Sequence, residues 1–219
     1  MPRLLFEKSG NAVWISHLDL MRLFQRAFKR AGLPLTHTHG YNPRPSVSIA
    51  LPLSVGVESC CEILDFDLNS EMPEYSEILE RLNAALVDGI KVLDVYNNGM
   101  KLRDLSLMKS IITMQYNGVV PESAETEIHS LFNSSSLIVE KKTKNGIQDQ
   151  DIIPMIHSIE IDRVGKYALE ITLIHCCQNP TLNPMQIPAA INKYLPECSA
   201  DSVRYCRKEI FDQKLSVFR

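Results

Sequence analysis

A turn-rich segment over residues 36–46 holds the side chains of this sequence that are best suited to chemistry. It carries His37 and His39, followed by Tyr41 and Arg44. An imidazole can act as a general acid or base, an aromatic ring can stack on an unpaired base, and a guanidinium can bind phosphate. Two prolines flank the arginine and restrict its backbone, so the loop is expected to present it in few conformations.

The two histidines leave more than one interpretation open. Their His-x-His pattern permits a metal site, but such a site needs three or four converging ligands and no third ligand stands at motif spacing. We therefore expect no metal and no cofactor. His37 or His39 is a candidate catalytic residue for acid–base chemistry, and the alternative is a structural loop with surface histidines.

A row of basic side chains precedes this loop. Arg22, Arg26 and Arg30 recur every four residues, with Lys29 beside the last of them and no acid in the row after Asp19. This spacing places the arginines on one face of a helix. Aligned guanidinium groups suit phosphate, which arginine binds through paired hydrogen bonds. The solvated outer face of an ordinary helix is the alternative interpretation.

The distribution of charge agrees with a local anion-binding face. The 219-residue chain has a net charge of −3, yet residues 1–50 contain seven Lys and Arg against two acids. The acidic surplus lies entirely in the remainder. A basic N-terminal region on an acidic body predicts a localised anion site and argues against a strong general nucleic-acid binder.

Four carboxylates form a further group after residue 57: Glu58, Glu62, Asp65 and Asp67. The two aspartates share one face of a predicted strand. Paired carboxylates can form an acid–base couple or hold magnesium. We favour the outward face of an edge strand, where charged residues are common.

The cysteines and the apolar segments indicate a compartment. None of the six cysteines belongs to a C-x-x-C motif, and no apolar run reaches 18 residues. We also expect that the N-terminal residues are not a signal peptide. We expect reduced thiols in a cytoplasmic protein. His175 precedes two cysteines, and the three residues together resemble a soft-metal site. Because His175 shares a strand face with Leu169, Ile171 and Leu173, we instead expect a buried, hydrogen-bonded histidine.

The elements that must position these groups follow the order strand, helix, strand, strand, helix, strand. We predict strands and helices at residues 3–8, 17–31, 47–51, 57–68, 70–86 and 91–96, with residues 12–15 extended and Ser16 as the helix N-cap. This order predicts a ferredoxin-like module over residues 1–98.

The second half repeats this order after a linker over residues 99–107. Residues 108–219 show predicted strands at 110–116 and 137–142, a polar, mobile loop at 143–151, a hairpin at 156–175 and a last strand from 203. Helices are predicted to start at Pro121 and near Pro184. The expected fold is α+β, with two tandem ferredoxin-like (βαββαβ) modules, antiparallel sheets and one surplus strand. The tandem repeat is topological, without repetition of residues.

The first 68 residues resemble the uncharacterised radical-SAM-linked domain family. The matching segments are ISHLDL (15–20), RAGLPL (30–35), GYNPRP (40–45) and ALPLSVGVES (50–59), followed by Glu62. They contain the motif residues His17, Asp19, Gly40, Asn42, Pro43 and Glu58. Tyr41 stands where the family more often has Phe, which keeps the aromatic ring and adds a hydroxyl.

Members of this family occur alone or attached to the C-terminus of radical SAM proteins, so the resemblance implies a radical SAM protein as partner. This chain has no three-cysteine cluster motif of its own. Family members also lie beside genes for a ribosome-associated ribonuclease and ribosomal proteins, which implies RNA-related work. Three hypotheses follow: an accessory RNA-binding module for tRNA or rRNA modification or processing, a metal-independent endoribonuclease, and a protein-only adaptor. In the first, the RNA-binding residues are Arg22, Arg26, Lys29, Arg30, Tyr41 and Arg44.

Overall fold

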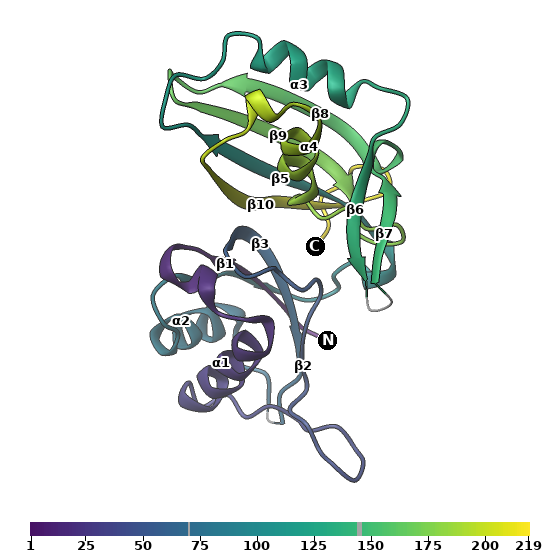
Figure 1. Cartoon of the computed structure of the whole chain (residues 1–219). Coiled ribbons are helices and arrows are strands. Elements are labelled where there is room, and N and C mark those ends of the chain that lie inside the picture. Colours follow the sequence, from purple (N-terminus) through teal and green to yellow (C-terminus); the bar gives the residue numbers. More distant parts are fainter. Residues whose placement is uncertain (70, 144–145) are drawn as a thin grey trace. The chain divides into compact units, whose positions relative to one another are not determined.

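The computed structural model describes residues 1–69, 71–143 and 146–219. The chain divides into two compact units, each with its own hydrophobic core. The first unit comprises residues 1–104 together with Phe218 and Arg219, and the second comprises residues 105–217. Both units combine α-helices with antiparallel strands, and the described part of the chain contains four α-helices (Figure 1).

The first unit has the order of elements that the sequence predicts. Its strands and α-helices are β1 (Arg3–Lys8), α1 (His17–Arg30), β2 (Val47–Ile49), β3 (Val57–Phe66), α2 (Tyr75–Ala85) and β4 (Ile90–Tyr96). A 3-10 helix, η1 (Gly10–Trp14), follows β1, and η2 (Leu102–Asp104) follows β4. All strand pairs are antiparallel: β1 pairs with β3 and β4, and β2 pairs with β3.

Helix α1 is fixed by its apolar face and by its first turn. Phe24 contacts Phe6 of β1 with ring centroids 4.7 Å apart, and Phe28 contacts Phe66 of β3 at 5.1 Å. Ser16 is the predicted N-cap, and its Oγ accepts a hydrogen bond from the Asp19 backbone N–H at 3.2 Å. Because the aromatic face packs against the sheet, the basic face of α1 is exposed to solvent.

The prediction of an extended segment at residues 12–15 holds for Ile15 but was wrong for residues 12–14, and a buried lysine explains the difference. Lys8 is 1% exposed, and its Nζ donates hydrogen bonds to the carbonyls of Val13 (3.1 Å) and Ile15 (2.8 Å). These bonds hold the chain in the turn of η1. Burial lowers the pKa of Lys8, and the nearby negative charge of buried Glu62 opposes this shift.

Helix α2 starts later than predicted. It begins at Tyr75, after Glu74, whose ψ of 142° is not helical. Pro73 disfavours helical geometry at Met72, so the helix does not extend further back. The predicted start at Ser70 lies outside the described residues. Ile78 and Leu82 are buried in the core as the apolar pattern predicts.

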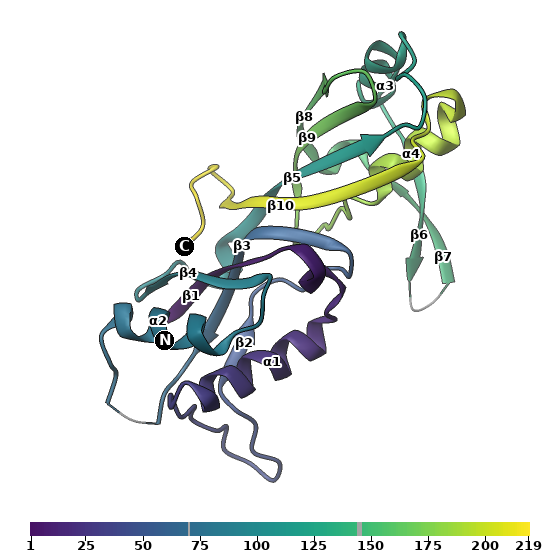
Figure 2. The same cartoon turned by 90° about the vertical axis from the view of Figure 1, so that its left-hand side faces the viewer.

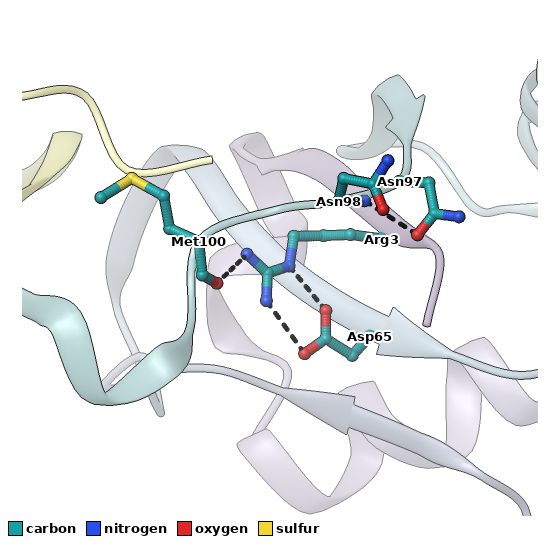
Figure 3. A network of polar contacts seen from close by, with 5 residues as sticks. All are labelled: Arg3, Asp65, Asn97, Asn98 and Met100. Atoms are coloured by element: carbon teal, nitrogen blue, oxygen red, sulfur yellow. Dashed lines mark hydrogen bonds and ion pairs between the residues drawn. The ribbon is translucent and has the colours of Figure 1, made fainter.

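A buried ion pair joins the first strand to the third (Figure 3). Arg3 is 6% exposed, and its Nε and Nη2 donate to the two carboxylate oxygens of Asp65 at 2.6 and 3.2 Å. Its Nη1 donates to the carbonyl of Met100 at 3.0 Å, and the ring of Phe218 lies 5.4 Å from its guanidinium. The edge-strand interpretation of Asp65 was therefore wrong, since β3 has a neighbour on each side and the carboxylate neutralises a buried cation.

The second unit also forms an antiparallel sheet. Its elements are β5 (Leu105–Gln115), α3 (Ala124–Phe132), β6 (Ile138–Thr143), β7 (Gly146–Asp151), η3 (Ile153–Met155), β8 (Ile156–Arg163), β9 (Ala168–Cys176), α4 (Gln186–Tyr194), η4 (Pro196–Cys198) and β10 (Ser202–Asp212). The strand order is β10-β5-β9-β8. Strands β6 and β7 pair only with each other in a separate two-stranded sheet within the described residues.

The polar segment 143–151 differs from its prediction as a mobile loop. Residues 146–151 form β7 and pair with β6, so the second unit has two strands beyond the expected order where one was predicted. Its end is anchored because Asp151 Oδ1 accepts hydrogen bonds from the N–H groups of Leu137 and Ile153. Residues 144 and 145 lie outside the described residues.

His175 is a buried, hydrogen-bonded core residue, as the sequence predicts. It is 0% exposed, and its Nδ1 lies 3.2 Å from the carbonyl of Cys176, which can only accept a hydrogen bond. Nε2 is then the acceptor for the hydroxyl of Ser110 at 2.9 Å. Burial is the main cause that lowers the pKa of His175 from 6.5 to about 4, and the positive charge of Arg207 adds to it.

Two further features concern the chain as a whole. None of the six cysteines forms a disulfide in the described structure. Among the helices of the described ranges, none is long and apolar enough to cross a membrane.

Replacing Asp65 with Ala is expected to destabilise the first unit strongly. The change leaves the buried guanidinium of Arg3 without its carboxylate, which costs about 3–5 kcal/mol in comparable pairs. Urea unfolding measures the loss. Asp104→Ala is the matched control, because it removes an exposed partner of Arg103 and should cost less than about 1 kcal/mol. Equal losses in the two variants would contradict the role given to Asp65.

The buried imidazole of His175 predicts a dependence of stability on pH. Its pKa is lower in the folded protein, so the unfolded chain binds more protons between pH 6.5 and 4. The free energy of unfolding should therefore fall as the pH falls through this window, by roughly 3 kcal/mol in total. His175→Gln should flatten this dependence, whereas the same change at exposed His157 should not. Parallel pH profiles of wild type and His175→Gln would refute the assignment.

Candidate nucleic-acid interface

Residues 36–46 form a paired, hairpin-like projection, which we term the arm. His37 forms an antiparallel bridge with Pro45. The N–H of Thr38 donates to the carbonyl of Arg44, and the N–H of Ser46 donates to the carbonyl of Thr36, both at 2.8 Å. Within the first unit, the arm extends away from the sheet beyond β2 and the end of α1 (Figures 1 and 2).

The base of the arm is tied to the residue that follows strand β3. The N–H and the hydroxyl of Thr36 donate to the backbone carbonyl and the carboxylate of Asp67, at 2.9 and 3.0 Å. The N–H of Asp67 in turn donates to the carbonyl of Ser46 at 3.1 Å. The edge-strand interpretation of Asp67 was wrong for this reason: its carboxylate anchors the arm.

The tip of the arm presents exposed side chains. Tyr41 is 100% exposed, and His39, Asn42 and Arg44 are also exposed. Gly40 has a φ of +142°, a backbone conformation that side-chain-bearing residues rarely adopt. The tip thus offers an aromatic ring and a guanidinium on a scaffold held by backbone hydrogen bonds.

A cavity of about 440 Å³ lies between α1 and the arm, and we term it the arm groove. It is lined by Gln25 and Lys29 of α1, by residues 32–35, and by His37 and Pro45 of the arm. Lys29 and His37, both predicted site residues, therefore meet at one hollow. Gln25 was missed by the sequence analysis, although it stands one helical turn before Lys29 and so on the same face.

The arginine row lines a different hollow on α1. Arg22, Arg26 and Arg30 border a cavity of about 390 Å³ together with Ile15, Asp19, Leu23 and Val87. The row and the arm therefore meet different hollows of α1, and Lys29 alone among the predicted cations of the helix lines the arm groove.

The cations of α1 differ in how far their charge is already engaged. Arg22 forms an ion pair with Asp19 at 3.0 Å, and Arg30 donates to the carbonyl of Ala85 at 2.6 Å. The pKa of Asp19 is lowered, first by the Ser16 hydroxyl and then by Arg22. Within the described ranges, Arg26 and Lys29 form no ion pair with an acidic side chain. These two cations are thus the most available to an anionic ligand.

The remaining motif residues lie outside the described lining of the arm groove. His17 is the first residue of α1 and is half-buried, and its Nδ1 has no hydrogen-bond partner among the described residues. Glu62 is 1% exposed near Lys8, whereas Glu58 is exposed on β3. Pro43 is exposed in the arm. None of these residues lines the arm groove as described.

One cluster in the second unit has ligand atoms at metal-compatible distances: Glu127, Glu197 and Cys198. Burial raises the pKa of the Cys198 thiol to about 11, and the thiol donates to a carboxylate oxygen of Glu127 at 3.6 Å. Metals bind the thiolate, so a protonated thiol that serves as a donor does not favour a metal here.

Sequence comparison places the chain in a family. The profile of a family described as "Uncharacterized protein conserved in bacteria (DUF2344)" matches residues 2–184. The chain belongs to this family. The DUF2344 match includes the whole arm, α1 and the residues of the arm groove. A search of proteins with curated functions found no match.

One comparison with a solved structure supports the α+β fold. A chain in the crystal structure of a Cbf5-Nop10-Gar1 complex matches with a TM-score of 0.53 and 9% identity, over 95% of this chain and 48% of that one. A chain in a structure of an H/ACA RNP bound to a substrate RNA containing 2'-deoxyuridine matches with a TM-score of 0.48 and 8% identity, over 98% and 48%. This DUF2344 chain thus spans about half the length of each.

Replacing Thr36 with Val should loosen the arm without unfolding the unit. The change removes the hydrogen bond from the hydroxyl to Asp67, which is worth about 1 kcal/mol, or roughly fivefold in local opening. Hydrogen exchange of the Thr38 and Ser46 amides should accelerate by that factor. Ser48→Ala, a change at the exposed residue of β2, is the control and should leave both amides unchanged. Unaltered exchange in Thr36→Val would show that the carboxylate of Asp67 does not anchor the arm.

Proposed function

We propose that this chain is an accessory RNA-binding module that works with a radical SAM enzyme in the modification or processing of tRNA or rRNA. The observation that carries the proposal is the arm, whose fully exposed Tyr41 stands at the tip and whose base borders a groove with Lys29. RNA readers combine cations for affinity with aromatic rings that stack on unpaired bases.

The electrostatic part of the proposal rests on helix α1. Arg26 and Lys29 are exposed and form no ion pair in the described structure, so binding a phosphate breaks no existing ion pair. Arg22 and Arg30 also bind phosphate in this proposal, but each must first leave Asp19 or the carbonyl of Ala85. We therefore assign the larger share of the affinity to Arg26 and Lys29, with Arg44 contributing from the arm.

The stacking part rests on the order of the arm. Its cross-strand hydrogen bonds and the anchor at Asp67 hold the backbone before any ligand arrives. A preorganised loop loses less conformational entropy on binding than one that folds around its ligand. Tyr41 can thus offer its whole ring to a base with little loss of conformational entropy.

The architecture that presents this surface is, in our proposal, a pair of ferredoxin-like modules. The strand orders β4-β1-β3-β2 and β10-β5-β9-β8 support this assignment, with the β6–β7 hairpin as an insertion between α3 and β8 of the second module. Module boundaries at residues 1–98 and 108–219, and a cytoplasmic location, belong to the same proposal. The radical SAM partner rests on the resemblance of residues 3–68.

A second candidate function is a metal-independent endoribonuclease. It is favoured by one observation, the lining of the arm groove by both His37 and Lys29. An imidazole can transfer the proton of a ribose hydroxyl, and an adjacent ammonium can stabilise the charge that develops on phosphate. His39 is the alternative acid–base group, at the exposed tip.

RNA affinity and its dependence on salt test the proposal. Arg26→Ala and Lys29→Ala should each weaken binding of bulk tRNA and reduce the slope of log K against log salt by about one per lost phosphate contact. Tyr41→Ala should cost about 1–3 kcal/mol through lost stacking. Fluorescence anisotropy over a salt series measures both effects, and Lys166→Ala, an exposed change in the second unit, is the matched control.

Three outcomes separate the hypotheses. Cleavage of the RNA that disappears in His37→Ala or His39→Ala while affinity is kept would establish the ribonuclease. If the protein binds no RNA at low salt and instead binds a purified radical SAM partner through the same surface, that outcome would establish the protein-only adaptor and rule out the RNA-binding module. Equal losses of RNA affinity in the Lys166→Ala control and in Lys29→Ala would contradict the assignment of RNA binding to this surface.

A further inference from the structure

The arm groove has a chemically divided lining. The apolar part of the lining is formed by buried Leu33 and Leu35 and by the rings of Pro34 and Pro45. The polar groups come from two elements: Gln25 and Lys29 from α1, and His37 from the arm. A volume of about 440 Å³ falls within the range of about 300–1,000 Å³ that is typical of small-ligand sites.

Each part of this lining fits one part of a nucleotide. A nucleobase is flat and apolar on its faces, so it packs against proline and leucine side chains. Its edge carries hydrogen-bond donors and acceptors, which the side-chain amide of Gln25 can match because the amide offers both. The attached phosphate is an anion, and Lys29, which has no acidic partner in the described structure, lies on the same lining.

From this match we propose that the arm groove is a binding site for one extruded nucleotide of an RNA. The base packs against the apolar lining and is recognised at its edge by Gln25, and its phosphate is held by Lys29. This inference rests on the RNA-binding function proposed above and refines it, because a base can enter the groove only when it is unpaired and unstacked. The module accordingly selects loops, bulges or single strands over continuous duplex.

The identity of the polar groups separates recognition from general affinity. Lys29 contacts the phosphate, so its loss weakens every RNA alike. Gln25 contacts the base edge, so its replacement by Leu, which keeps the size and removes the amide, affects only RNAs whose base the groove prefers. A residue that only shapes the helix surface would not discriminate between bases.

Fluorescence of 2-aminopurine tests the site in the full-length protein. The probe is a short single-stranded RNA with one 2-aminopurine, compared with the same strand in a duplex. Binding should raise the fluorescence of the single strand, because the base leaves its neighbours, and the protein should bind it at least about tenfold more tightly than the duplex. Gln25→Leu should abolish the rise and weaken binding of the preferred sequence about tenfold. Gln148→Leu, an exposed change on β7, is the matched control and should change neither.

A titration with the four nucleoside 5'-monophosphates, followed by the NMR signals of the Gln25 side-chain amide, gives an independent readout. Shifts with one or two of the nucleotides are expected. RNA binding with the predicted salt slope, but without a fluorescence rise, amide shifts or an effect of Gln25→Leu, overturns this inference and leaves the proposed function standing. If a mononucleotide shifts the Gln25 amide signals but the protein binds no RNA, the groove is still a nucleotide site and the proposed function is overturned. Absence of all these responses overturns both.

Discussion

The contact of Arg3 with Asp65 is the interaction on which the first unit depends. Both groups would carry a large desolvation cost alone, and their paired hydrogen bonds offset it only while both are present. The pair sets β1 against β3 at one end of the sheet. Two residues later, Asp67 anchors the arm, so the placement of the arm groove follows from how β3 ends.

The two faces of α1 divide stability from recognition. The aromatic face, with Phe24 and Phe28, packs against β1 and β3 and is buried there. The opposite face can therefore carry cations whose loss costs the fold little, since exposed ion pairs contribute less than about 1 kcal/mol. The cations of that face differ in whether they already have an acidic partner. Arg22 is paired with Asp19, whereas Lys29 lines the arm groove.

Local patterns were sufficient to predict α1, because its apolar spacing and the cap at Ser16 are properties of consecutive residues. The arm was recognised as a loop, but its anchor is Asp67, a partner some thirty positions away that no spacing rule connects to it. Gln25 escaped notice for the same reason, as its significance comes from the arm that faces it. The turn of η1 was missed because a buried lysine looks, in sequence, like any other charged residue.

The assignment of Phe218 to the first unit bears on how the chain acquires its structure during synthesis. The ribosome releases residues 1–104 long before residue 218 emerges, yet this fully buried ring belongs to the first unit and covers the guanidinium of Arg3. The first unit therefore cannot complete its core, and the guanidinium of Arg3 stays uncovered by Phe218, until the second unit has been translated. A fragment cut at residue 104 would keep that gap permanently, so isolated fragments of the first unit should be marginal while the full chain is stable.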